Sequence, residues 1–389
     1  MVLPLAIATL SVLPLGAIGA PGPLVARAPL AVDVRSGQVR SAGADTAWIV
    51  GLPNHSTKAA ASTDGATISL SRSARSTTIS VRGATDRVAR RTRTIKGLWR
   101  FPVPVADEPA QPVSADGSKI LLARADADGE FAVMAADLRS MPEFVSLGSQ
   151  YTFDAASPSG DLLYLTEHRN GAEYAVRAYK MVTRELVSEP VVVKGERSGV
   201  MTGSPMARAT SPDGEWVYTL YERQGAAPFI HALNTEGMFS LCIDLPPHGD
   251  VAGANTAWAL GAAGSSVVAA NTALGQLWRA PGTDLSAKPR SVAIPVTSGR
   301  PVLSAPALFE HSVILGTQAG LWAVEVGSLT LTELAKGVAV ERILIGSDGV
   351  TAFVVGERRA GTIAVDLTTG ARLTNSTAAA RLGRTVLYG

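Results

Sequence analysis

The tetrapeptide Ser211-Pro212-Asp213-Gly214 most constrains the fold of this chain, because related turns recur along it and each precedes a strand-like apolar segment. The copies occur at residues 63–65, 114–117, 157–160, 262–264 and 347–349. The Asp-Gly pair tolerates positive φ, and the β-branched residues that follow suit a pleated surface. The repeat therefore predicts an all-β fold built from similar units.

The spacing of these turns indicates the size of one unit. The turn glycines stand at 65, 117, 160, 214, 264 and 349, so the last step is nearly twice as long as the others. A degenerate turn at 307–311, which leads into the apolar segment 312–315, fills the gap. The 284 residues between the first and last turn glycines then divide into six steps of about 47 residues, the length of a four-stranded propeller blade.

A second pattern alternates with the first. The segment 364–370 reads as a strand that ends in a turn, and similar pieces occur at 134–138, 230–234 and 321–325. Each unit thus offers two hairpins, or four strands, and no long stretch has helical periodicity. Because a blade cannot bury both faces alone, neighbouring blades must stack around an axis, which predicts a β-propeller.

The two ends of the chain look related to the repeat. Residues 31–37 resemble 364–370, and residues 383–388 read like the start of another inner hairpin. We expect N-terminal strands to complete a blade begun at the C-terminus, which would close the ring and remove open sheet edges. Seven blades are predicted, with eight as the alternative.

These repeats resemble two known kinds of propeller. The Ser-Pro-Asp-Gly pattern is similar to the WD40-like repeat of TolB-type propellers, and the segment 364–370 is similar to YVTN-type repeats of bacterial surface-layer proteins. The resemblance covers most of residues 31–389 and implies a bacterial, secreted β-propeller. Its motifs specify blades and carry no chemistry, so it implies no cofactor. The Trp-Asp dipeptide of true WD40 repeats is absent.

The N-terminal residues 1–28 contain a single charged side chain, Arg27, and resemble the apolar part of a signal peptide. We therefore expect a signal peptide or N-terminal apolar segment at 1–28 and a single propeller domain at 29–389. The expected location is secreted, extracellular or associated with the cell envelope. Contact with a membrane would come only from this segment if it stayed uncleaved.

The charge distribution limits the choice of partners. The net charge is only +2, which gives no case for nucleic acid, but residues 71–100 hold one acidic residue among many basic ones. We interpret the basic segment as a solvated outer face, with an anionic envelope polymer, lipid headgroups or an acidic partner as the alternative. Cys242 is the sole cysteine, and its apolar strand predicts a buried, unreactive thiol.

Standard catalytic signatures are missing from the sequence. It contains no His-Glu-x-x-His, no Gly-x-Ser-x-Gly, no phosphate-binding loop and no paired cysteines. Residues 126–130 resemble part of a calcium loop but lack its later ligands, so we interpret them as a hairpin turn. We expect neither a bound metal nor a cofactor.

Charged residues follow the second strand of several units. In a four-stranded blade the turns alternate between the two faces of the disc, so the second turn of each blade should lie on the same face as the connections between blades. A ring of such residues around the channel mouth could bind a polar or anionic ligand, although exposed turns are commonly charged. The candidate ligand-binding residues are Asp154, Glu167, His168, Arg169, Glu222, Arg223, His248, Asp250, Glu357 and Arg358.

Three functions remain open from the sequence. The favoured one is a monomeric, non-catalytic scaffold that binds a protein or an envelope polymer. The alternative is a propeller hydrolase of the lactonase type with a polar site at the channel mouth. The third is an extracytoplasmic sensor domain, for which residues 1–28 would have to remain as an anchor.

Overall fold

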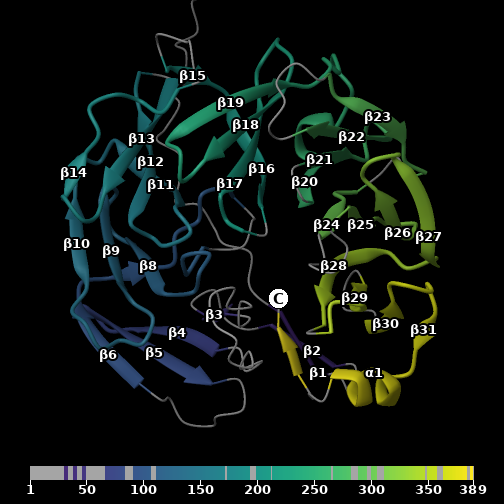
Figure 1. Cartoon of the computed structure of the whole chain (residues 1–389), viewed down its shortest axis with the longest axis horizontal. Helices are drawn as coiled ribbons and strands as arrows, with labels where there is room; N and C mark the ends of the chain where they lie inside the picture. Colours follow the sequence, from purple (N-terminus) through teal and green to yellow (C-terminus); the bar gives the residue numbers. More distant parts are fainter. Residues whose placement is uncertain are drawn as a thin grey trace, which may run out of the picture.

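The structure is a computed structural model, in which strands follow one another around a ring (Figure 1). It describes residues 30–33, 38–41, 46–49, 66–83, 91–106, 111–170, 173–192, 199–211, 213–263, 266–281, 288–295, 299–304, 311–346, 348–356, 362–382 and 386–388. Within these ranges the helices are a 3-10 turn, η1 (Ala254–Thr256), and α1 (Asn375–Leu382). The expected segment 1–28 lies outside the described residues, and no described helix is long and apolar enough to cross a membrane.

Seven antiparallel sheets follow in chain order, each along a path of four consecutive strands, and we number them blades 1 to 7. Blade 1 contains β3 (Thr46–Ile49), β4 (Ala66–Arg72), β5 (Ser76–Gly83) and β6 (Arg91–Lys96). Blade 2 contains β7 (Trp99–Arg100), β8 (Lys119–Arg124), β9 (Glu130–Ala135) and β10 (Glu143–Ser146). Blade 3 contains β11 (Tyr151–Ala156), β12 (Leu162–His168), β13 (Glu173–Lys180) and β14 (Glu185–Leu186), and β15 (Met201–Thr202) also pairs with β13.

The second half of the ring repeats this pattern. Blade 4 contains β16 (Ser204–Thr210), β17 (Trp216–Glu222), β18 (Phe229–Asn234) and β19 (Phe239–Asp244). Blade 5 contains β20 (Trp258–Ala263), β21 (Ser266–Asn271), β22 (Gln276–Pro281) and β23 (Arg290–Ala293). Blade 6 contains β24 (Val302–Ser304), β25 (Ser312–Gly316), β26 (Gly320–Glu325) and β27 (Thr330–Lys336). Blade 7 contains β28 (Val340–Ile345), β29 (Thr351–Gly356), β30 (Thr362–Asp366) and β31 (Arg372–Leu373).

Strands from both ends of the chain close the ring. β1 (Leu30–Asp33) pairs on one side with β2 (Gln38–Ser41) and on the other with β32 (Val386–Tyr388). This three-stranded sheet lies between blade 7 and blade 1 in Figure 1. The expected seven-bladed propeller closed by its terminal strands is confirmed, and the closing strands form a small sheet of their own.

The repeated Ser-Pro-Asp-Gly turn is a compact set of hydrogen bonds. In blade 4, Gly214 N donates to Ser211 O at 2.8 Å, and Ser211 N donates to Trp216 O at the same distance. Trp216 N donates to Ser211 Oγ at 2.9 Å, while Asp213 Oδ1 accepts from Glu215 N at 3.0 Å. Gly214 has φ +77°, a left-handed conformation that glycine adopts without strain. The turn residues therefore satisfy the backbone groups that a hairpin would otherwise leave open.

The same bonds recur in blade 2, which explains the sequence repeat. Gly117 N donates to Ser114 O at 2.9 Å, Lys119 N donates to Ser114 Oγ at 3.0 Å and Ser118 N donates to Asp116 Oδ1 at 2.9 Å. The serine, aspartate and glycine are thus required by the hairpin itself, and Asp116 N also donates to Pro158 O of the next blade at 3.0 Å.

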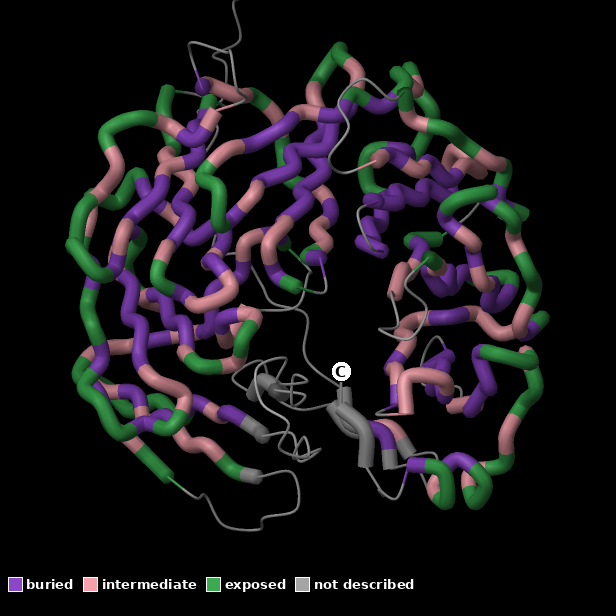
Figure 2. The backbone as a smooth tube through the Cα atoms, viewed as in Figure 1, coloured by how far each residue is buried: buried purple, intermediate pink, exposed green. Residues whose placement is uncertain are grey.

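The core consists of apolar layers between neighbouring blades. All six residues of β21 and of β29 are buried, because both faces of each strand meet another blade. Between blades 4 and 5, a cluster of buried side chains contains Tyr218 and Trp258. Figure 2 shows the buried residues concentrated in the middle strands of the blades and many exposed ones along the outer rim.

Candidate functional site

The strand register places the second turns of the blades on one face of the disc. In blade 3, Tyr151 at the start of the innermost strand lies opposite Glu167, whereas the first turn at 157–160 is at the other end of the strands. In blade 4, Ser204 lies opposite Glu222 in the same way. We call the side that carries the second turns and the connections between blades the second-turn face.

Glu222 is the centre of a polar cluster on this face. It lies at the end of β17 with a side chain that is 9% exposed, and its carboxylate contacts His248 Nε2 at 3.0 Å. The same carboxylate accepts a hydrogen bond from Trp258 Nε1 at 2.5 Å. His248 belongs to the connection from blade 4 to blade 5, and its Nδ1 lies 3.0 Å from Gly249 O. The cluster therefore ties two blades and their connection together.

Glu167 is the centre of a second polar cluster, in blade 3. Its carboxylate accepts hydrogen bonds from Tyr151 Oη at 3.1 Å, Arg169 at 3.2 Å and Arg177 at 3.1 Å. Burial alone would raise the pKa of Glu167, but the hydrogen bonds from Arg177, Arg169 and Tyr151 outweigh it and lower the pKa below its ordinary value. Glu167 is therefore ionised and engaged near neutral pH.

Asp154 lies beneath this face, between blades 3 and 4. Its carboxylate contacts Arg208 at 2.8 Å, and both side chains are only 6% exposed. The other guanidinium nitrogen of Arg208 donates to Asp154 O at 2.5 Å, and the first also donates to Thr219 Oγ1 at 3.0 Å. This placement makes Asp154 a buried ion-pair partner between blades, within the first strand of blade 3.

A row of side chains extends outward from this ion pair across blade 4. Arg208 lies opposite Thr219, Thr219 opposite His231, and His231 opposite Cys242. His231 is 1% exposed, and burial lowers its pKa to about 4, although the charge of Asp154 opposes that shift. Cys242 is only partly buried, which corrects the expectation of a fully buried thiol.

The remaining predicted site residues that the structure describes do not converge. His168 is exposed and its Nε2 lies 2.8 Å from Thr152 Oγ1. Arg223 donates to Ala227 O at 2.8 Å and lies over the ring of Phe229, so it is partly committed to its own turn. Asp250 is exposed in the connection from blade 4 to blade 5. Glu357 and Arg358 lie outside the described residues. Of the ten candidates, the described structure joins Glu222 with His248 and Glu167 with Arg169.

Sequence reasoning missed Arg300, which lies in the connection between blades 5 and 6. Its guanidinium donates to Trp258 O at 3.1 Å and to Met206 O at 3.1 Å. These carbonyls belong to the starts of β20 and β16, so one side chain spans three blades on the second-turn face. No local pattern marks Arg300, because its partners lie 42 and 94 residues away.

Two arginines of the basic segment link blade 1 to blade 2. Arg91 donates to Asp137 O at 3.0 Å, and Arg93 donates to Leu138 O at 2.9 Å and 3.1 Å. These contacts attach the outer strand of blade 1 to the last turn of blade 2. Arg87 and Arg90, from the same segment, lie outside the described residues.

Within the described ranges, no group of three His, Cys, Asp or Glu side chains is arranged so that it could hold a metal ion. A hollow of about 530 Å³ lies between blades 1 and 2, and it is lined by charged and aromatic side chains that include Arg75, Lys96, Arg124 and Phe144. It lies at the second-turn end of the blades, because Arg75 belongs to the second turn of blade 1.

Comparisons with known proteins identify the architecture only. No protein-family model matches the chain, and no curated protein matches its sequence. Among solved structures, apo AztD from Citrobacter koseri is 11% identical with a TM-score of 0.50, over 89% of this chain and 84% of that chain. The Cps50 (Swd1) β-propeller domain of Myceliophteria thermophila is 9% identical with a TM-score of 0.47, over 83% and 96%. Chaetomium thermophilum Sqt1, bound to the N-terminus of ribosomal protein L10, is 13% identical with a TM-score of 0.47, over 80% and 83%. The seven four-stranded sheets around a ring make the chain a β-propeller, and the comparisons establish nothing finer than this fold.

Proposed function

We propose that this chain is a non-catalytic propeller that binds a protein or an envelope polymer on its second-turn face. The observation that carries the proposal is the arrangement of Glu222, His248 and Trp258. Glu222 contacts His248 at 3.0 Å and Trp258 at 2.5 Å, so hydrogen bonds attach the connection between blades 4 and 5 to both blades. A rigid, polar surface is what a binding scaffold requires, because little conformational entropy is lost when a partner docks.

The same contacts argue against acid-base catalysis at this position. A general base works best when its pKa is near the working pH and when its oxygens can reach the substrate. The Glu222 carboxylate is already engaged by His248 and Trp258, so its oxygens are not free to accept a proton from a substrate. We therefore rank a hydrolase of the lactonase type second.

The side chains that a partner would meet are the exposed ones around these clusters. His168, Arg169 and Asp250 are exposed on this face. In our proposal, Glu167 and Glu222 hold the loops, and the exposed residues contact the partner. We also propose that the protein acts outside the cytoplasm, which rests only on the apolar residues 1–28. We further propose that it is a monomer.

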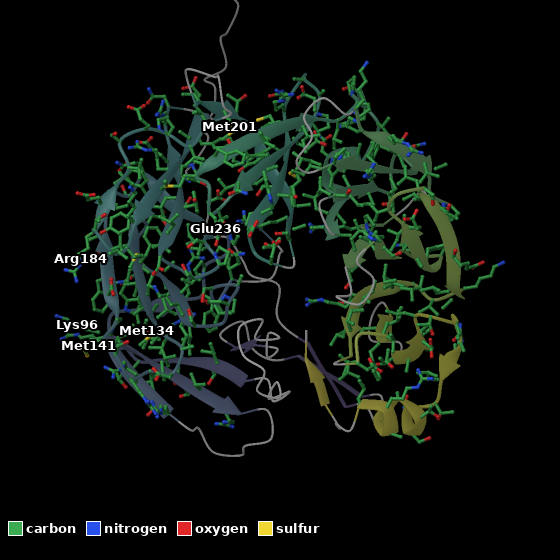
Figure 3. The ribbon with its side chains drawn as sticks, viewed as in Figure 1. Lys96, Met134, Met141, Arg184, Met201 and Glu236 are labelled. Carbon is green, nitrogen blue, oxygen red and sulfur yellow. The ribbon has the colours of Figure 1, made fainter. Side chains whose placement is uncertain are left out.

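Site-specific crosslinking tests the proposal. A photoreactive residue is placed at His168 or Asp250 on the second-turn face, and in matched controls at Glu215 or Glu236 near the turns of the opposite face, with Glu236 labelled in Figure 3. Crosslinked partners are identified by mass spectrometry from cells that produce the chain.

We expect one protein or polymer to be enriched from the second-turn positions alone, and its affinity to fall when His168 and Arg169 are replaced by alanine. A partner that crosslinks only from Glu215 or Glu236 would contradict the proposed face. Turnover of a lactone by the purified chain, abolished by Glu222→Gln, would favour the hydrolase instead.

A further inference from the structure

The hollow between blades 1 and 2 has two walls of different character. One wall is the second turn of blade 1 and the end of β6, with Arg75 and Lys96; the other is blade 2, with Trp99, Arg124 and Phe144. Figure 3 shows Lys96 at the outer rim of the ring. This groove is separate from the Glu222 and Glu167 clusters, so an inference about it does not depend on whether those clusters bind a ligand.

The floor of the groove is aromatic and held in place. Trp99 is 3% exposed, its Nε1 donates to Lys96 O at 2.8 Å, and the Arg124 guanidinium lies 5.4 Å from its ring centroid. The Phe144 ring lies 5.6 Å from the Trp99 ring and is 55% exposed. A large aromatic side chain exposed on a supported floor is an anchor point for an apolar group of a ligand.

The charges of the two walls are not balanced. Arg124 bonds Asp126 at 2.7 Å and Glu130 at 2.8 Å; the bond to Asp126 raises the pKa of Arg124, and the bond from Arg124 lowers the pKa of Asp126. The side chains of Arg75 and Lys96 make no hydrogen bond or ion pair to the described residues. Among the lining residues, blade 2 thus carries two carboxylates and one cation, and blade 1 carries two cations without a partner in the described ranges.

The outer edge of blade 2 also offers backbone groups. Leu147 N donates to Gly129 O at 2.8 Å, and hydrogen-bonded pairs alternate along an antiparallel ladder. The N–H and C=O groups of Phe144 and Ser146 consequently point away from β9, and no described strand pairs with that edge of β10. Such an edge accepts an extended peptide as an added strand.

We propose that this groove binds an extended acidic peptide segment of a protein partner. An apolar side chain of the peptide packs on Phe144, its carboxylates face Arg75 and Lys96, and its backbone lies along β10. A nucleic acid fits less well, because Arg124 already covers the Trp99 ring on which a base would stack. A membrane fits less well, because the cations line a recess.

Fluorescence anisotropy with synthetic peptides tests this inference on the full chain. The probes are a labelled eight-residue peptide that alternates glutamate with phenylalanine, the same peptide with lysine for glutamate, and one with serine for phenylalanine. The variants are Arg75→Ala with Lys96→Ala, Phe144→Ala, and the control Arg139→Ala, which removes an exposed cation from the opposite end of blade 2. Circular dichroism of each variant shows whether the fold is intact.

We expect saturable binding of the acidic, aromatic peptide, which weakens about tenfold in the double variant and about tenfold in Phe144→Ala. Binding should also weaken with added salt, because the cations are exposed. The Arg139→Ala control should bind like the parent chain.

Several results would overturn the inference. The inference is wrong if the acidic peptide shows no saturable binding, if the lysine peptide binds equally well, or if both groove variants keep the affinity of the parent chain. It is also wrong if the chain binds anionic vesicles or single-stranded DNA more strongly than the peptide. None of these results changes the expected crosslinks from His168 and Asp250, so the proposed function is tested separately.

Discussion

Replacement of Asp154 by alanine should destabilise the propeller more than any change to a surface ion pair. Asp154 and Arg208 are each 6% exposed, so the variant leaves a guanidinium buried between blades 3 and 4 with no carboxylate. Breaking a buried pair in this way costs about 3–5 kcal/mol, because the remaining charge stays out of water. Since whole domains are stable by only about 5–15 kcal/mol, the loss is a large part of the total.

Calorimetry and urea unfolding measure the effect. Unfolding entropy is about 2 cal/mol/K per residue, so a chain of 389 residues that unfolds in one step should lose about 5 °C in Tm for a loss of about 4 kcal/mol. The control Arg139→Ala removes a side chain that is 73% exposed and pairs with Asp137 at 3.3 Å, and it should cost under about 1 kcal/mol.

The double variant Asp154→Leu with Arg208→Met separates the ion pair from simple packing. Replacing both charged partners by apolar side chains removes the unpaired charge, so much of the lost stability should return. If Asp154→Ala unfolds within about 1 kcal/mol of the parent chain, then the pair is solvated in solution and the argument from burial is wrong.

Three further predictions concern turns, pH and ring closure. Gly214→Ala should lower the free energy of unfolding in urea by at least about 2 kcal/mol, because φ is +77° and the new Cβ would lie 2.2 Å from Ala115 Cβ. Gly225→Ala, with φ +71° and open space around the new Cβ, should cost only the backbone strain of about 1 kcal/mol. Equal losses in the two variants would show that the contact relaxes. Burial lowers the folded-state pKa of His231 to about 4, below the unfolded value of about 6.5, so the folded state binds fewer protons. The free energy of unfolding linked to neutral His231 is fully present above about pH 6.5, and on the order of 3 kcal/mol of it is lost as pH falls toward 4. The urea midpoint of the His231→Gln variant should therefore depend less on pH over that range than the midpoint of the parent chain. Deleting residues 386–388 removes the strand that pairs with β1 and should broaden the melting transition; an unchanged sharp transition would mean that the closing sheet contributes little.

The blades and their order could be predicted from the sequence, because the bonds that define each first turn are local. Ser211 Oγ accepts a hydrogen bond from Trp216 N five residues away, and Ser114 Oγ accepts one from Lys119 N in the same way, so a short motif contains all the partners of the turn. The matching ends likewise predicted closure, which the pairing of β1 with β32 confirms. Strand alternation then placed the second turns on one face without any knowledge of packing.

Only the tertiary structure decided what the polar side chains do. Glu222 meets Trp258 from the next blade, Asp154 is buried against Arg208, and the groove joins residues of β6 and β10 across two blades. These contacts depend on how far each sheet twists and on which side chains fill the space between neighbouring blades. A local sequence motif predicts neither of these. The sequence predicted His168 in an exposed turn and Asp154 in a connection between blades. Asp154 instead lies within β11 and is buried, because burial between blades is a property of the stacked ring.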